Sequence, residues 1–205
     1  AGPNFEDLLW EALLDTNCDL TMAQTAEELA DRYAVSREEA DQVAYNSHQR
    51  ARAAWDAGHF DAEVAGVVIK SRKGETTFAA DEHIRSDTTM EALGGLRPYF
   101  RKDGLVTAGN ASGIGDGAAS AVLAGSDWAE ANGVAPIGRI VSWGFVGVEP
   151  QVMGIGPAPA ARLALEKAGL TLDDMDLVEV NEAFSPQDKS VEKELGLNPD
   201  KTNVN

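Results

Sequence analysis

The sequence predicts an α/β fold in which helices cover layers of strands. In the second half, segments 139–145 and 176–180 show the β-rich pattern of strands, and a helical pattern fills 157–169 between them. The chain has 205 residues, of which 43% are hydrophobic and 25% charged, so it can bury a substantial core. Strand, helix and strand in alternation indicate a layered α/β architecture.

Helical patterns dominate the beginning of the chain. Leucines and alanines recur at helical spacing within 5–14, which predicts a short amphipathic helix. Thr25-Ala26-Glu27-Glu28 and Ser36-Arg37-Glu38-Glu39 both fit the capping box, so a helix should begin at each. The second helix should end at Gly58. His48 lies in this helix without a second ligand at i+4, and we expect a surface histidine there rather than a metal ligand.

Three further elements are predicted between and after these helices. Segment 64–70 is short and β-branched, and 76–78 can return beside it as the second strand of a hairpin. Segment 126–132 predicts a short helix closed by a glycine. A last helix should begin at Ser185-Pro186, where proline suits the first turn.

The stretch 106–121 is filled almost completely by small residues and carries four glycines within nine positions. Such a run allows another group to approach the backbone closely, and a connection between two packed layers is its simplest interpretation. A phosphate-binding loop is the weaker alternative, because the spacing is not G-x-x-x-x-G-K-[ST] and no lysine follows. Asn110, Ser112 and Asp116 are its main polar side chains.

Composition excludes several classes of function. Acidic residues outnumber basic ones by 34 to 17, for a net charge of −17, which argues against nucleic-acid binding. No apolar run reaches the length of a membrane span. Cys18 is the only cysteine, so no internal disulfide can form and a reducing compartment is expected. We predict a cytoplasmic protein, with the mitochondrial matrix as the alternative.

Asn181 is the best candidate site residue by position alone. It directly follows the predicted strand 176–180. In open α/β sheets, ligands bind beyond the carboxyl ends of the strands.

Three ordered segments carry a resemblance to a known family: Thr107-Ala108-Gly109-Asn110-Ala111-Ser112-Gly113, Val152-Met153-Gly154-Ile155-Gly156-Pro157 and Asn181-Glu182-Ala183-Phe184. In order and spacing the chain resembles the thiolases over essentially its whole length, and most of all the 3-ketoacyl-CoA thiolases. The resemblance implies a layered α-β-α-β-α fold, incomplete here, with an α-rich inserted loop domain. Residues 1–105 would be most of that loop domain, 106–135 the end of the N-terminal half, and 136–205 the first part of the C-terminal half.

The resemblance also implies a reaction. Thiolases move an acyl group between a 3-ketoacyl-CoA and CoA with release of acetyl-CoA, as in β-oxidation, or run the reverse Claisen condensation. They use a nucleophilic cysteine, a Gly-His-Pro histidine and a Cys-x-Gly cysteine, with coenzyme A thioesters as substrates and no other cofactor or metal. None of these three motifs occurs here, and Cys18 does not match the nucleophile. We therefore expect the chain to be the central part of a longer thiolase and inactive by itself.

Several positions match the binding side of a thiolase site. Asn181 matches the asparagine that holds a water in an oxyanion hole, and Ser112 the serine that binds the pantetheine arm. Arg85 matches a basic residue near the CoA nucleotide, whereas Ala92 replaces a serine that some relatives carry near the adenine. Residues matching the wall of the pantetheine tunnel are Met22, Met153, Ala183 and Phe184.

Two alternatives remain beside the enzyme. A thiolase-like protein could bind acyl-CoA without catalysis, and it would need the same tunnel. An acidic interaction domain without a ligand is the third interpretation. The expected partners are acyl-CoA and CoA, with no nucleic acid and no membrane span, and the resemblance implies a homodimer or homotetramer.

Overall fold

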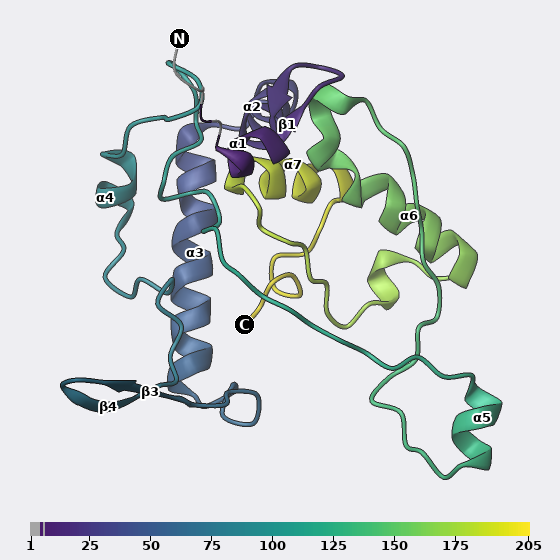
Figure 1. The fold of residues 1–205 in the computed structure, drawn as a ribbon. Helices are drawn as coiled ribbons and strands as arrows, with labels where there is room; N and C mark the ends of the chain where they lie inside the picture. The colour runs from purple at the N-terminus through teal and green to yellow at the C-terminus, as the bar shows by residue number, and fades with distance from the viewer. Residues whose placement is uncertain (1–4, 6) are drawn as a thin grey trace.

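Helices α2, α3 and α7 pack together in the upper part of the view in Figure 1. The structure is a computed structural model that describes residues 5 and 7–205. Helix α3 is the longest element, and α7 packs against both α2 and α3. The α-helices are α1 (Leu8–Ala12), α2 (Met22–Arg32), α3 (Arg37–Asp56), α4 (Met90–Gly94), α5 (Ser126–Ala131), α6 (Pro157–Ala168) and α7 (Ser185–Leu195). Two 3-10 helices are η1 (Pro150–Ile155) and η2 (Leu172–Asp174). None of the described helices is long and apolar enough to cross a membrane.

Capping boxes begin both central helices, but one lies earlier than predicted. At α3, Ser36 Oγ accepts a hydrogen bond from Glu39 N at 3.1 Å and Glu39 Oε2 accepts one from Ser36 N at 2.7 Å, which confirms the predicted start. At α2, the cap is Thr21 and its partner is Gln24. The prediction of a start at Thr25 was wrong, because Thr21-x-x-Gln24 completes the same motif one turn earlier.

Small side chains let the central helices approach closely. Two buried apolar clusters hold the packing, one of Ala23, Ala26 and Val106 and one of Ala30, Val35 and Ala40. Phe184, at the start of α7, packs against the first cluster and so joins α7 to α2.

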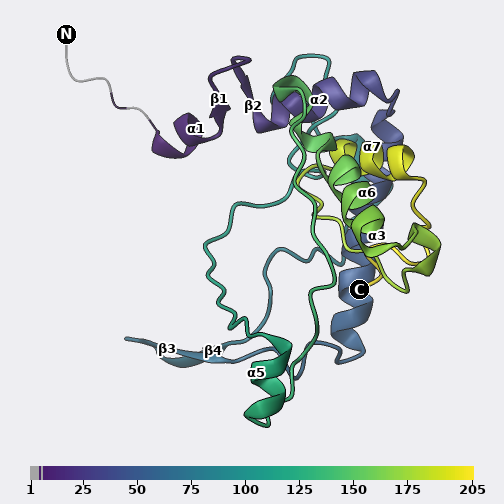
Figure 2. The ribbon, with the colours of Figure 1, turned by 90° about the vertical axis from the view of Figure 1, so that its right-hand side faces the viewer.

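The predicted hairpin is confirmed. Strands β3 (Val67–Ser71) and β4 (Gly74–Phe78) pair antiparallel and project beyond the end of α3 (Figure 2). A second, two-residue pair, β1 (Leu14–Asp15) and β2 (Leu20–Thr21), precedes α2. Helices α5, α6 and α7 lie where the sequence predicts, and Gly133 and Gly169 follow α5 and α6 with positive φ.

The strands predicted at 139–145 and 176–180 are absent as paired strands. Within the described residues, 139–145 makes no strand pairing, and 176–180 contributes one parallel bridge, between Val178 and Thr202. The segments on either side of α5 run as long extended connections away from the helices (Figure 1). A strand exists only when a neighbouring strand shares its hydrogen bonds. Among the described residues, 139–145 lies against helix α6, where Lys167 Nζ donates to the Trp143 carbonyl at 3.1 Å, and no strand pairs with it. Most of the motif at 152–157 is helical, because η1 runs through Ile155.

Candidate functional site

A groove of about 810 Å³ lies between α3, the segment 82–96 and the glycine-rich loop. We call this hollow the large groove. Arg85 and Ser112, which the sequence predicts as binding residues, both line it and both are exposed. Its other polar wall residues are Ser47, His48, Glu82, His83, Asp87, Thr88, Asn110, Glu182 and Ser185.

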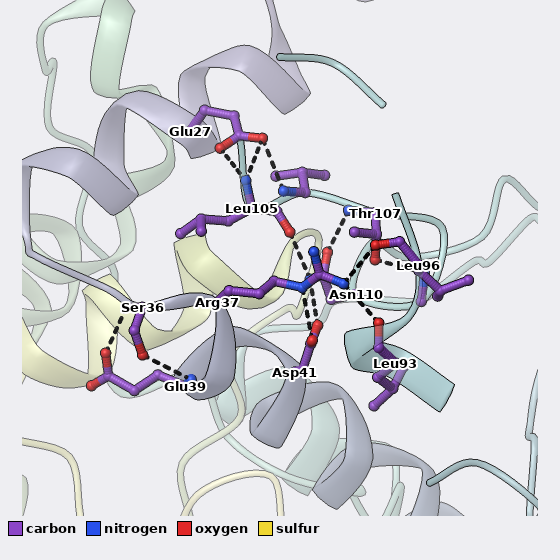
Figure 3. A network of polar contacts seen from close by, with 12 residues as sticks. Glu27, Ser36, Arg37, Glu39, Asp41, Leu93, Leu96, Leu105, Thr107 and Asn110 are labelled. Atoms are coloured by element: carbon purple, nitrogen blue, oxygen red, sulfur yellow. Dashed lines mark hydrogen bonds and ion pairs between the residues drawn. The ribbon is translucent and has the colours of Figure 1, made fainter. Parts of the chain in front are cut away.

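The base of the glycine-rich loop is held by a buried carboxylate. Glu27 of α2 is 1% exposed, and its carboxylate accepts hydrogen bonds from Leu105 N at 2.8 Å and Val106 N at 2.9 Å. Figure 3 shows Glu27 hydrogen-bonded to Leu105. Arg101, which pairs with Asp31 at 2.6 Å, also lies 3.4 Å from the Glu27 carboxylate and offsets its charge. A buried charge is stable only when it is paired and hydrogen-bonded, as here. Helix α2 therefore fixes the entry to the loop.

Asn110 holds the middle of the loop from inside. Its Nδ2 donates to Asp41 Oδ1 and to the Leu105 carbonyl, both at 2.9 Å, and its Oδ1 accepts from Thr107 N at 2.8 Å. Arg37 pairs with the other oxygen of Asp41 at 2.7 Å (Figure 3). Arg37 also donates to the carbonyls of Leu93 in α4 and Leu96 just after it, so one network positions both walls of the large groove.

The loop is hydrogen-bonded to the segment that precedes α7. Ser112 N donates to the Ala183 carbonyl at 3.0 Å, and Ser185 N donates to the Asn110 carbonyl at 2.9 Å. Between these bonds, Ala111 and Phe184 form an antiparallel bridge. The structure therefore brings together Ser112, Ala183 and Phe184, which the sequence separates by about 70 residues and which were all predicted as site residues.

Asn181 lines a second hollow of about 570 Å³. We call it the small hollow. Its walls are Ser47, Ala51, Glu179, Val180, Asn181, Glu182, Asn203 and Asn205. Ser47, Ala51 and Glu182 also line the large groove, so the two hollows adjoin along α3. Asn181 therefore lies in a hollow that shares wall residues with the groove lined by Ser112.

The two predicted methionines lie apart from these hollows. Met22 is the first residue of α2 and Met153 lies in η1, and each is a little over one-third exposed. Neither is among the described residues that line the large groove or the small hollow. Helix α2 packs against η1, so both methionines border the same layer of the molecule.

His48 is a wall residue that sequence reasoning missed. It is half-buried, and its Nδ1 accepts a hydrogen bond from Arg85 N at 3.3 Å. Burial lowers the pKa of His48, and the positive charge of Arg85 lowers it further. The helical spacing of the sequence could have indicated this position. Ala44 and Ala51, four residues before and three residues after His48, lie on the same face of α3 and line the same groove, as Ser47 does.

Together these hollows suit a long, polar ligand better than a compact one. Arg85 and the two histidines of the large groove can meet phosphate or an aromatic base, and the Ser112 hydroxyl can bond an amide. Cys18 lies between β1 and β2, and it is not among the described residues that line either hollow. Over the described part of the chain, no group of three or more His, Cys, Asp or Glu side chains converges as a metal site would.

Known proteins are similar to this chain over nearly all of its 205 residues. The thiolase N-terminal domain matches residues 3–127 and the thiolase C-terminal domain matches residues 134–205. The mitochondrial 3-ketoacyl-CoA thiolase of Homo sapiens is 52% identical over 98% of this chain and 50% of its own length. An acetyl-CoA acetyltransferase of Paracoccus denitrificans is 49% identical over the same shares. The chain thus spans about half the length of the curated relatives it matches.

Solved structures agree with these matches. The crystal structure of Bacillus anthracis acetyl-CoA acetyltransferase superposes with a TM-score of 0.93, at 48% identity, over 100% of this chain and 52% of that one. Human mitochondrial 3-ketoacyl-CoA thiolase in complex with CoA superposes with a TM-score of 0.90, at 52% identity, over 98% and 50%. This agreement confirms the predicted fold class. Since both halves match thiolase domains and relatives of this identity extend along nearly all of it, the chain belongs to the thiolase family.

Proposed function

We propose that this chain forms the substrate-binding side of an acyltransferase of the thiolase type. The enzyme would transfer an acyl group between a 3-ketoacyl-CoA and CoA with release of acetyl-CoA, or catalyse the reverse Claisen condensation. The observation that carries the proposal is the hydrogen-bonded junction of Ser112 with Ala183 and Phe184, beside the hollow that holds Asn181. The human relative whose structure contains CoA supports the identity of the ligand.

The large groove would bind coenzyme A along its length. In this proposal Arg85 meets the nucleotide end, where a planar guanidinium can stack on adenine or pair with phosphate. Ser112 donates to an amide of the pantetheine arm, which needs a polar partner once it leaves water. Ala183, Phe184, Met22 and Met153 stay the predicted apolar wall of the pantetheine arm, and all four lie outside the described lining of the two hollows. Coenzyme A thioesters are the substrates, and no further cofactor is assigned.

Asn181 would act on the reaction itself. In thiolysis a cysteine sulfur attacks the 3-keto carbon, the C2–C3 bond breaks, and acetyl-CoA leaves as an enolate that takes up a proton. A neutral amide, acting through a water, can donate a hydrogen bond to the oxygen on which that negative charge develops. We assign no catalytic part to Cys18, and in this proposal the nucleophile and its base lie outside these 205 residues.

A second candidate is a thiolase-like protein that binds acyl-CoA without turning it over. It shares the binding groove with the enzyme, so only turnover distinguishes the two.

The assembly and location stay predictions. A homodimer or homotetramer is proposed from the family alone, and light scattering tests it. Relatives named as mitochondrial support the mitochondrial alternative, and the cytoplasm stays the prediction made from the sequence.

The test uses the complete gene product that contains these residues. Calorimetry measures CoA binding, and loss of acetoacetyl-CoA in the presence of CoA measures thiolysis. The proposal expects both, and it expects Arg85→Ala to weaken CoA binding. Binding without turnover would support the non-catalytic alternative and refute the enzyme. Absence of CoA binding would refute both and support the acidic interaction domain.

A further inference from the structure

We infer that Asn203 is the residue that positions Asn181, and that Arg50 of α3 anchors Asn203 in turn. This inference rests on the proposed function, because it assigns Asn203 a part in the same reaction. The sequence offers no local sign of it, since Asn203 lies 22 positions after Asn181.

The Asn203 side chain holds the backbone just before Asn181 and the side chain just after it. Its Oδ1 accepts from Val180 N at 2.8 Å, and its Nδ2 donates to the Val180 carbonyl at 3.0 Å. The same Nδ2 donates to Glu182 Oε1 at 2.9 Å. One amide thus satisfies both backbone groups of the residue before Asn181 and the carboxylate of the residue after it.

Backbone hydrogen bonds extend this clamp in register. Asn203 N donates to the Val178 carbonyl at 3.0 Å, and Val178 N donates to the Lys201 carbonyl at 2.8 Å. Asn203 itself adopts a φ of 47°, in the left-handed region that asparagine tolerates better than most residues. The conformation of the backbone and the chemistry of the side chain therefore both favour asparagine at this position.

Arg50 fixes the clamp to the longest helix. Its Nη1 donates to the carbonyls of Thr202 at 2.9 Å and Asn203 at 3.0 Å, and its Nη2 donates to the Pro199 carbonyl at 3.0 Å. A guanidinium presents these donors in a rigid fork, which the single ammonium of lysine cannot copy. Helix α3 also lines both hollows, so Arg50 ties the position of Asn181 to the groove wall.

Asn181 needs such external support. It is exposed, and its own side chain makes no hydrogen bond with the rest of the described chain. The direction of its amide is therefore set by the backbone on either side. A catalytic donor displaced by about 1 Å can lose on the order of 10²-fold in rate.

The experiment compares Asn203→Ala and Arg50→Lys in the complete gene product, each with and without Asn181→Ala. We expect Asn203→Ala to lower kcat by about 10- to 100-fold with the KM for CoA thioesters little changed. In the Asn181→Ala background, the same change should lower kcat no further, because the group it positions is gone. Arg50→Lys should give a smaller loss of the same kind. Asn132→Ala, an exposed asparagine after α5, is the matched control and should leave kcat unchanged.

Hydrogen exchange of the Val180 amide provides a readout that is independent of turnover. Asn203→Ala removes its acceptor, so this amide should exchange faster, while the thermal midpoint shows that the variant is folded. Equal losses of kcat in both backgrounds, a change in KM alone, or unchanged exchange of the Val180 amide would overturn the inference. If the wild type shows no turnover, the proposed function fails by itself, and faster exchange would still support the clamp.

Discussion

Replacing Asn110 by aspartate should break the hydrogen bonds that hold the glycine-rich loop and destabilise the fold. The change keeps the size and shape of the side chain and replaces its two donors with acceptors. In the native loop those donors satisfy Asp41 Oδ1 and the Leu105 carbonyl, both at 2.9 Å. After Asn110→Asp, the Leu105 carbonyl has lost this donor, and a second carboxylate faces Asp41.

The cost follows from burial. Asn110 and Asp41 are each 2% exposed, so neither can turn to water for a substitute hydrogen bond. A buried polar group left without its partner costs about 1–3 kcal/mol, and two are affected. Asp41 keeps Arg37 as a partner, which limits its share of the loss. We therefore expect a loss of about 3 kcal/mol in the free energy of unfolding at pH 7.

The pH dependence of the destabilisation shows whether it comes from the new buried carboxyl group or from a general loss of packing. The new carboxyl group is buried beside another, so its pKa rises above the unfolded value of about 3.9. The folded state then holds a proton that the unfolded state releases, so the destabilisation grows as the pH rises from about 4. Unfolding of the complete gene product at pH 4 and pH 7 measures this difference. Asn46→Asp, on the exposed surface of α3, is the control. Equal effects of the two substitutions at both pH values would refute the reasoning.

Three other substitutions test how individual carboxyl groups near the site affect stability. Asp188→Asn should raise the thermal midpoint at pH 8 and leave it nearly unchanged at pH 4. Burial, followed by the charges of Glu182 and Glu192, raises the pKa of Asp188 to about 7, so ionising it costs stability as the pH rises from about 4 to 7. Glu39→Gln should cost about 1 kcal/mol at pH 7 and little near pH 2. The hydrogen bond from Ser36 N, aided by Lys193, lowers the pKa of Glu39 to about 2, so its stabilisation is present above about pH 4.5 and lost as the pH falls toward 2. Glu27→Gln should cost about 2–4 kcal/mol and speed exchange of the Leu105 and Val106 amides, because one amide oxygen cannot replace two carboxylate oxygens; unchanged exchange would show that Glu27 does not hold the loop.

Local signals in the sequence predicted the helices well. The Ser36 capping box, the glycines after α5 and α6, and the proline in the first turn of α7 each act within one turn of the chain, and each is found as predicted. The start of α2 was misplaced because two threonines four residues apart both offered a cap. Only one of them has its partner glutamine in place.

Pairing between distant segments could not be predicted in the same way. Segment 139–145 has the alternating pattern of a strand, yet a pattern does not supply the neighbour that a strand requires. The site shows the same division. Asn181 and Ser112 could be named from their motifs, whereas the contribution of Arg50 and Asn203 depends on a fold that brings residues 50, 181 and 203 together.

The division of roles between Asn181 and Ser112 tests the central claim most directly. The charge that Asn181 would stabilise exists only as the enolate forms, and the arm that Ser112 would hold is bound equally before and during the reaction. Steady-state thiolysis by Asn181→Ala should therefore show a kcat lower by on the order of 10²–10³ with KM little changed. Ser112→Ala should chiefly raise the KM for CoA thioesters. If Asn181→Ala altered only KM, or if Ser112→Ala abolished kcat and left KM alone, the proposed site would be wrong.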